Sequence, residues 1–180
     1  MIYIHLATGF EEIEALTVTD VLRRSGADVK TVSVTGERLV KGAHEIAVEA
    51  DILFDEADYS RCEMLVLPGG MPGTINLGKH SGLAHELKSA AKAGKWVCAI
   101  CAAPMVLGNL ELLEGKNATI YPGMEGHLLG AKPVNAAVVC DGNIITSMGP
   151  GTAMEFAFAL TEALFGEEKA DALRDEMIYE

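Results

Sequence analysis

The chain has 180 residues, of which 49% are hydrophobic and 22% charged, and its formal net charge is −12. This length suits one domain with a sizeable core, so residues 1–180 are interpreted as a single domain. The acidic balance argues against nucleic acid and anionic membranes as partners. Few cysteines, no basic leader and no apolar run of membrane-spanning length favour a cytoplasmic protein.

Apolar periodicity predicts strands and helices that alternate through most of the chain. In chain order, the predicted elements are a strand over 2–7, a helix over 11–24, a strand over 27–34, a loose ribbon over 37–50, strands ending at 67 and 100, a helix over 81–93, a helical segment over 105–110, a short strand near 117–120, strands over 134–140 and 143–147, and two C-terminal helices. Asp141-Gly142 is a hairpin signal, and Thr152 with Glu155 forms a capping-box pattern. The alternation predicts an α/β three-layer sandwich with a mostly parallel sheet.

Glu14 lies on the same stripe of the first helix as three apolar residues. A carboxyl buried on such a stripe would have a raised pKa, because desolvation disfavours its charged form. From spacing alone the simpler interpretation is a surface glutamate or a first-turn partner of the helix dipole, since unpaired Glu is almost never buried.

A glycine-rich turn follows the strand that ends at Leu67. Gly69-Gly70 at a strand end allows backbone N–H groups to approach a ligand, although an ordinary turn fits the same pattern. The turn lacks the Lys-Ser/Thr of a phosphate-binding loop.

Cys101 directly follows the buried strand Trp96–Ile100, and small residues and a helical pattern come after it. This order predicts a nucleophile elbow, in which Cys101 lies at a helix N-terminus that favours a thiolate. The alternative is a buried structural cysteine.

Cys98 and Cys101 form a Cys-x-x-Cys pattern, for which a redox pair is conceivable. Side chains three apart on a strand point to opposite faces, so Cys98 is expected to face away from Cys101 and to lie in the core. The chain has no second Cys pair or His pair at metal-ligand spacing, so no metal site is predicted.

Four segments together resemble the ThiJ/PfpI family, in the branch of the parkinsonism-associated deglycase. They are GFEEIE at 9–14, LPGG at 67–70, AICAAP at 99–104 and TSMGPGT at 146–152, and their order and spacing agree across nearly the whole chain. The resemblance implies a flavodoxin-like fold, no cofactor and a homodimer.

The resemblance also implies roles for individual residues. Cys101 matches the reactive cysteine, and Glu14 matches the glutamate whose protonated carboxyl hydrogen-bonds that sulfur, which replaces the simpler interpretation of Glu14. Gly70 matches the glycine whose N–H, with that of Cys101, forms an oxyanion hole. Gly69 and Ala102 are expected to line the same substrate-binding site.

Three further residues are pocket candidates by the same resemblance. Arg24 matches a basic residue near the pocket, and His44 stands where its partner across the dimer is expected. Tyr121 replaces a histidine of the human-like branch, and Ala102 replaces the histidine that follows the cysteine in peptidase-like branches. No Cys–His dyad is therefore predicted, which weakens a peptidase or amidase reading.

The function implied is a cofactor-independent glyoxalase III or deglycase. Its substrate would be a small reactive aldehyde of the methylglyoxal type, or a glycated adduct, bound through a hemithioacetal at Cys101. The alternative is an oxidative-stress sensor or holdase chaperone that uses the same cysteine.

Overall fold

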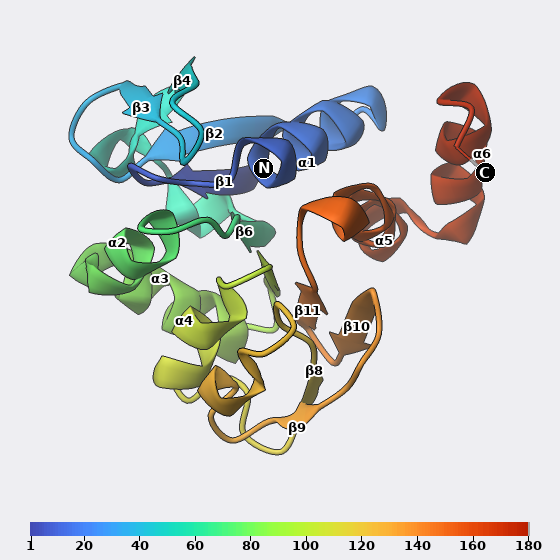
Figure 1. Cartoon of the computed structure of the whole chain (residues 1–180). Coiled ribbons are helices and arrows are strands. Elements are labelled where there is room, and N and C mark those ends of the chain that lie inside the picture. The colour runs from blue at the N-terminus through green and yellow to red at the C-terminus, as the bar shows by residue number, and fades with distance from the viewer. Residues whose placement is uncertain (180) are drawn as a thin grey trace.

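A seven-stranded sheet forms the centre of the computed structural model, which describes residues 1–179 (Figure 1). The strands, in spatial order, are β10 (Val138–Asp141), β11 (Ile144–Ser147), β7 (Trp96–Ile100), β6 (Met64–Leu67), β1 (Ile2–Leu6), β2 (Val29–Ser33) and β5 (Ile52–Leu53). Every neighbouring pair is parallel except β10–β11, which is the hairpin expected at Asp141-Gly142. The predicted mostly parallel sheet is confirmed.

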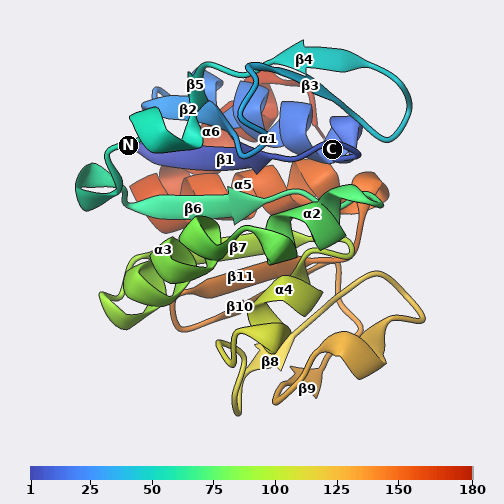
Figure 2. The same ribbon diagram turned by 90° about the vertical axis from the view of Figure 1, so that its left-hand side faces the viewer.

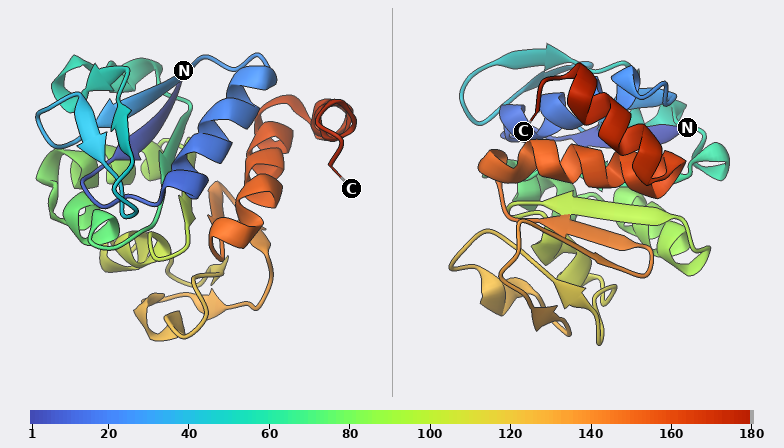
Figure 3. Two further views of the ribbon diagram at one scale, coloured as in Figure 1. Left: turned by 45° about the horizontal axis from the view of Figure 1, so that its top comes forward. Right: turned by 90° about the vertical axis from the view of Figure 1, so that its right-hand side faces the viewer.

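Helices cover both faces of this sheet (Figures 1 and 2). One face carries α1 (Glu12–Arg24) and α5 (Ala153–Phe165), and α6 (Glu167–Glu176) packs on the outer side of α5 (Figure 3). The other face carries α2 (Gly73–Lys79), α3 (Ser81–Lys92) and α4 (Pro104–Asn109). Each face buries its own apolar cluster, because strand side chains alternate between the two sides.

Two small strand pairs stand outside the main sheet. The antiparallel hairpin of β3 (Leu39–Lys41) and β4 (Ala47–Glu49) follows β2, and β8 (Asn117–Ala118) pairs in parallel with β9 (Lys132–Pro133). Short 3₁₀ turns lie at Phe54–Glu56, Tyr59–Arg61, Glu125–His127 and Pro150–Thr152. Among the described residues, none of the helices combines the length and the apolar character that a bilayer crossing requires.

One helix was not predicted, and two local predictions were wrong. The sequence gives no helical signal for α2, because Gly73 and Gly78 interrupt its apolar spacing. The strand expected over 134–140 is shorter: β9 ends before it at Pro133, and only residues from Val138 onward pair with β11, as β10. The Thr152 hydroxyl does not cap α5; it contacts the Ser147 hydroxyl at 2.7 Å and bonds Gly149.

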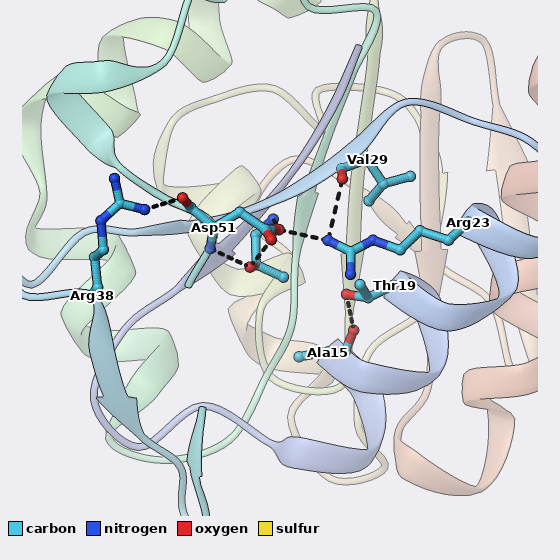
Figure 4. Close-up of polar contacts among 7 residues, drawn as sticks. Ala15, Thr19, Arg23, Val29, Arg38 and Asp51 are labelled. Atoms are coloured by element: carbon cyan, nitrogen blue, oxygen red, sulfur yellow. Dashed lines mark hydrogen bonds and ion pairs between the residues drawn. The ribbon is translucent and has the colours of Figure 1, made fainter. Parts of the chain in front are cut away.

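A polar brace ties α1 to the edge of the sheet (Figure 4). The Asp51 carboxylate pairs with Arg23 of α1 at 2.6 Å and accepts hydrogen bonds from the Thr31 N–H and hydroxyl of β2. Arg38, which precedes β3, donates to the Asp51 carbonyl. Asp51 therefore joins α1, strand β2 near the sheet edge and the segment that leads into the β3–β4 hairpin, which fixes the position of α1 over the sheet.

Candidate active site

Cys101 occupies a sharp turn between β7 and α4. Its φ is +63°, in the left-handed region that residues other than glycine rarely adopt. Its N–H donates to the Ser147 carbonyl at 2.9 Å, and its own carbonyl accepts from the Tyr121 N–H at 2.9 Å. The strained backbone is thus held from both sides, and this is the elbow geometry predicted from sequence.

The left-handed turn also decides which way the sulfur points. Cys98 is completely buried, as predicted, in the cluster beneath α1 and α5. Cys101 packs against the same cluster, so the expectation that the two face opposite sides was wrong. Strand alternation ends where φ becomes positive, and the Cys101 side chain turns back toward α1.

Glu14, in the first turns of α1, meets Cys101 there. Its side chain is fully buried, and its Oε2 accepts a hydrogen bond from the Gly69 N–H at 2.7 Å. Its Oε1 is buried without a hydrogen-bond partner among the described residues. The carboxyl lies within hydrogen-bonding reach of the Cys101 thiol. A proton on Glu14 would give the orphaned oxygen a partner, so the structure provides for a neutral carboxyl.

Burial controls the titration of both groups. Desolvation raises the pKa of Glu14 to about 7, although the Gly69 N–H and the Cys101 thiol oppose the shift. Desolvation, followed by the charge of Glu14, raises the pKa of Cys101 to about 12. The helix N-terminus alone therefore does not produce the expected thiolate, because burial outweighs it. A thiolate at Cys101 requires Glu14 to keep its proton.

The Gly69-Gly70 turn brings backbone donors to the sulfur. The backbone N–H groups of Gly70 and Ala102 lower the pKa of the Cys101 thiol, against the larger effects of burial and of Glu14. A Cβ at Gly69 would lie 2.6 Å from the Cys101 Cβ and 2.9 Å from Glu14 Oε2, so only glycine allows this approach. The Cys101 N–H, expected as the second oxyanion donor, is already bonded to Ser147. The N–H groups of Gly70 and Ala102 are the remaining candidates for that role.

The remaining pocket candidates lie at different distances from this centre. Tyr121 adjoins it through its bond to the Cys101 carbonyl, and its ring lies against Gly149. Arg24 is ten residues beyond Glu14, about 15 Å along the helix, and pairs with Asp20 in solvent. Within this chain it therefore does not contact Cys101.

His44 belongs to a cluster that the sequence did not suggest. Its N–H donates to Glu12 Oε1 at 2.7 Å, its ring Nδ1 lies 2.9 Å from Glu12 Oε2, and the Ile46 N–H also reaches Glu12. Glu12 thereby fastens the β3–β4 hairpin to the start of α1. Sequence spacing gives no signal for this contact, because the partners are more than thirty residues apart.

Among the described residues, Glu11, Glu12 and His44 form a group that could hold a metal ion, since one ligand atom from each lies within 4.8 Å of the others. The hydrogen bonds within the hairpin already satisfy Glu12. The hydrogen bond with Glu12, together with the charges of Glu11 and Glu12, raises the pKa of His44, as expected for a protonated ring paired with carboxylates.

Comparison with known proteins places this geometry in context. A sequence model described as DJ-1/PfpI family matches residues 1–163. "Protein DJ-1 homolog A" of Arabidopsis thaliana is 43% identical over 173 residues, which are 94% of this chain and 44% of that protein. "Glutathione-independent glyoxalase DJR-1.2" of Caenorhabditis elegans is 33% identical over 91% of this chain and 87% of its own length. The chain spans less than half the length of the Arabidopsis relative and most of the nematode one.

Solved structures agree in fold. The structure titled "Toxoplasma gondii DJ-1, oxidized" superposes with a TM-score of 0.95 at 34% identity, covering 99% of this chain and 97% of that one. DJ-1beta of Drosophila melanogaster superposes with a TM-score of 0.94 at 35% identity, covering 99% and 97%. The α/β fold with flanking helices is therefore shared along almost the full length of these chains.

Proposed function

The chain belongs to the DJ-1/PfpI family, and on that premise we propose that it is a cofactor-independent glyoxalase that converts 2-oxoaldehydes of the methylglyoxal type to 2-hydroxy acids. The observation that carries the proposal is the buried Glu14 carboxyl, with one unpartnered oxygen, beside a cysteine at a strained elbow. The nematode relative named as a glutathione-independent glyoxalase supports it.

The reaction begins with attack of the Cys101 sulfur on the aldehyde carbon of the substrate. The new carbon–sulfur bond converts the carbonyl to an alkoxide, which the N–H groups of Gly70 and Ala102 would stabilise. The proton on Glu14 then passes to the alkoxide and gives a hemithioacetal. No external cofactor enters this step, because the thiol itself replaces the glutathione that other glyoxalases use.

Glu14 then acts as a base toward the same adduct. Its carboxylate takes the proton from the former aldehyde carbon, the electron pair moves to the adjacent ketone, and Glu14 returns the proton to that carbon. The first carbon is oxidised to a thioester and the second is reduced to an alcohol, so no external oxidant is needed. Water cleaves the thioester and releases lactate from methylglyoxal, which restores the Cys101 thiol.

A deglycase activity on glycated adducts would use the same residues, because such an adduct still has an electrophilic carbon that the Cys101 sulfur can attack. A peptidase or amidase activity is less well supported, because Ala102 and Tyr121 occupy positions where other branches of the family carry histidine. Glu14 is then the acid–base group.

An oxidative-stress sensor, with or without holdase chaperone activity, is the second candidate. The backbone donors of Gly70 and Ala102 and a protonated Glu14 would equally hold a sulfinate at Cys101. The Toxoplasma gondii relative, whose structure is titled "oxidized", supports this second candidate.

Lactate formation from methylglyoxal by wild type and by Cys101→Ser separates the candidates. The glyoxalase proposal expects stereospecific lactate from wild type and a loss of at least about 100-fold in the serine variant, because serine is a far weaker nucleophile at this position. Wild-type protein that forms no lactate, yet gains two oxygen atoms at Cys101 in dilute peroxide, would support the sensor.

A further inference from the structure

Two carboxylates and an imidazole meet between the start of α1 and the β3–β4 hairpin, and the mechanism above uses none of them. They belong to Glu11, Glu12 and His44. Among the described residues, no other three His, Cys, Asp or Glu side chains bring their ligand atoms so close together. Carboxylate oxygens and imidazole nitrogens are ligands of Zn²⁺ in proteins, so the composition of this group is that of a metal site.

Glu11 supplies a carboxylate that the fold leaves without a hydrogen bond among the described residues. Its side chain is only 10% exposed, and it does not cap α1 although Glu11 is the N-cap residue. Its Oε2 lies 3.4 Å from His44 Nδ1, which carries at most one hydrogen and lies closer to Glu12 Oε2, at 2.9 Å. Buried charges in proteins are normally paired or coordinate a metal. The Glu11 carboxylate therefore points into the group and is available to a cation.

The two oxygens of Glu12 have separate partners. Oε1 accepts hydrogen bonds from the backbone N–H groups of His44 and Ile46 at 2.7 and 3.4 Å, whereas Oε2 faces the His44 ring. Hydrogen bonds to one oxygen orient a carboxylate so that the other can bind a metal, as in known metal sites. A Cβ at Gly42 would collide with the Glu12 carboxyl, so glycine is what allows the hairpin to approach it.

The spacing of the ligand atoms fits a small divalent ion. Zn–O and Zn–N bonds of about 2.0–2.2 Å at tetrahedral angles place neighbouring ligand atoms roughly 3.3–3.6 Å apart. His44 Nδ1 lies 2.9 Å from Glu12 Oε2 and 3.4 Å from Glu11 Oε2. The His44 side chain is 66% exposed, so a small outward movement of the ring completes this spacing. The two carboxylates balance the charge of the ion.

We propose that Glu11, Glu12 and His44 form a zinc site with three protein ligands and a fourth position open to water. Zn²⁺ bonds Glu11 Oε2, Glu12 Oε2 and His44 Nδ1, and a hydrogen on Nδ1 leaves as a proton. The ion thereby joins the hairpin to α1 and stabilises the folded protein, because the unfolded chain does not assemble the three ligands. The site does not depend on the proposed glyoxalase function, since neither Cys101 nor Glu14 is a ligand.

Calorimetric titration of the full chain with Zn²⁺ tests the site. Wild type should bind Zn²⁺, and His44→Ala should lose at least about tenfold in affinity, because even an outer-shell partner is worth roughly 10–100-fold. Glu11→Gln should lose a comparable factor while its thermal unfolding without zinc stays close to that of wild type, since its side chain does not cap α1. His85→Ala, at an exposed histidine on α3, is the matched control and should bind as wild type does.

Thiolates also bind zinc, so Cys101→Ser separates this site from the candidate active site. The serine variant should keep the affinity of the proposed site, and in it Zn²⁺ should shift the imidazole NMR signals of His44 but not those of His85. A wild-type protein that binds no zinc would overturn the proposal. So would zinc binding that survives both His44→Ala and Glu11→Gln, or that disappears in Cys101→Ser. Because the titration needs no turnover, its result is independent of whether the protein consumes methylglyoxal.

Discussion

At the residue scale, Cys101 and Glu14 form one titrating unit. Each group is desolvated, and ionisation of either one makes ionisation of the other harder. The pair therefore gives up one proton near neutral pH and keeps the second far above it. The remaining proton can sit on Glu14, which leaves a thiolate at Cys101, and the proposed mechanism starts from this form.

A substitution that keeps the shape of the Glu14 side chain but removes its ability to carry a proton tests whether Glu14 is the proton shuttle. Glu14→Gln preserves an oxygen for the Gly69 N–H and an amide donor for the sulfur, but it cannot accept and return a proton. We expect aldehyde turnover to fall by about 10²–10⁴-fold, the usual scale of general acid–base catalysis, while alkylation of Cys101 by iodoacetamide persists. Glu14→Leu removes the donor as well and should slow alkylation too. Near-normal turnover in Glu14→Gln would remove Glu14 from the mechanism.

Glu14 also predicts how stability depends on pH. Its pKa of about 7 in the folded protein exceeds the ordinary value of 4.5, so the folded state holds this proton more tightly than the unfolded chain. The stabilisation is present in full below the unfolded pKa and is lost as pH rises through the folded one. Between pH 5 and 7 the free energy of unfolding should fall by about 1 kcal/mol per pH unit relative to Glu14→Gln. Urea titrations of both proteins measure this difference, which a flat profile would contradict.

The most reactive of the four thiols should be Cys101. Cys98 and Cys62 are buried, whereas Cys101 is partly accessible to solvent. Cys140 is exposed but has no comparable set of donors among the described residues. Limiting iodoacetamide followed by peptide mass spectrometry should find label at Cys101 first, and earlier labelling of Cys140 would count against the site.

At the scale of elements, the turn after β6 matters as much as the elbow. Gly69→Ala would place a methyl group against both Cys101 and Glu14, so we expect loss of both alkylation and turnover. Gly126→Ala is the matched control, because a Cβ there meets nothing within 4 Å. Rates of iodoacetamide labelling and lactate formation, with thermal unfolding of both variants, separate a blocked site from a misfolded protein. Full activity in Gly69→Ala would show that the two groups do not approach as closely as described.

Most elements could be predicted because their signals are local. The strands ending at Leu67 and Ile100 are uniform apolar runs, and α1 ends at the expected Ser25-Gly26. The strand predicted over 134–140 is shortened by a partner distant in sequence, because the Val134 N–H bonds the Ala118 carbonyl and only residues from Val138 onward join β11. The capping box failed for a local reason, since the Thr152 hydroxyl bonds Ser147 and Gly149 and not the helix that it precedes.

The candidate site shows the same contrast between local signals, which could be predicted, and contacts between distant segments, which could not. Cys101 and Glu14 were identified from a strand end, an apolar stripe and a resemblance, and the structure brings them together. The actual donors at the sulfur could not be predicted, because the Cys101 N–H is taken up by a strand, β11, that follows more than forty residues later. The Glu12–His44 contact likewise arises only when separate segments meet.

At the scale of the whole molecule, the resemblance predicts a homodimer. Ile13 and Leu16 on α1 and Ile46 on the hairpin are exposed apolar side chains, and Ile46 lies beside the start of α1 through Glu12. We expect light scattering at micromolar concentration to give twice the chain mass, and Leu16→Lys to shift the protein toward monomer. Ile178→Lys, at an exposed position near the C-terminus, is the control. A monomeric wild-type protein would contradict the prediction.

The left-handed backbone at Cys101 has a consequence for protein engineering. Glycine adopts this conformation freely, whereas a side chain there costs roughly 1–2 kcal/mol. A design procedure that rewarded thermostability alone would therefore choose glycine at 101 and erase the thiol while improving the scaffold. Heat resistance and chemistry compete at this one position, so any library built to harden the protein must hold residue 101 fixed and seek its gains elsewhere.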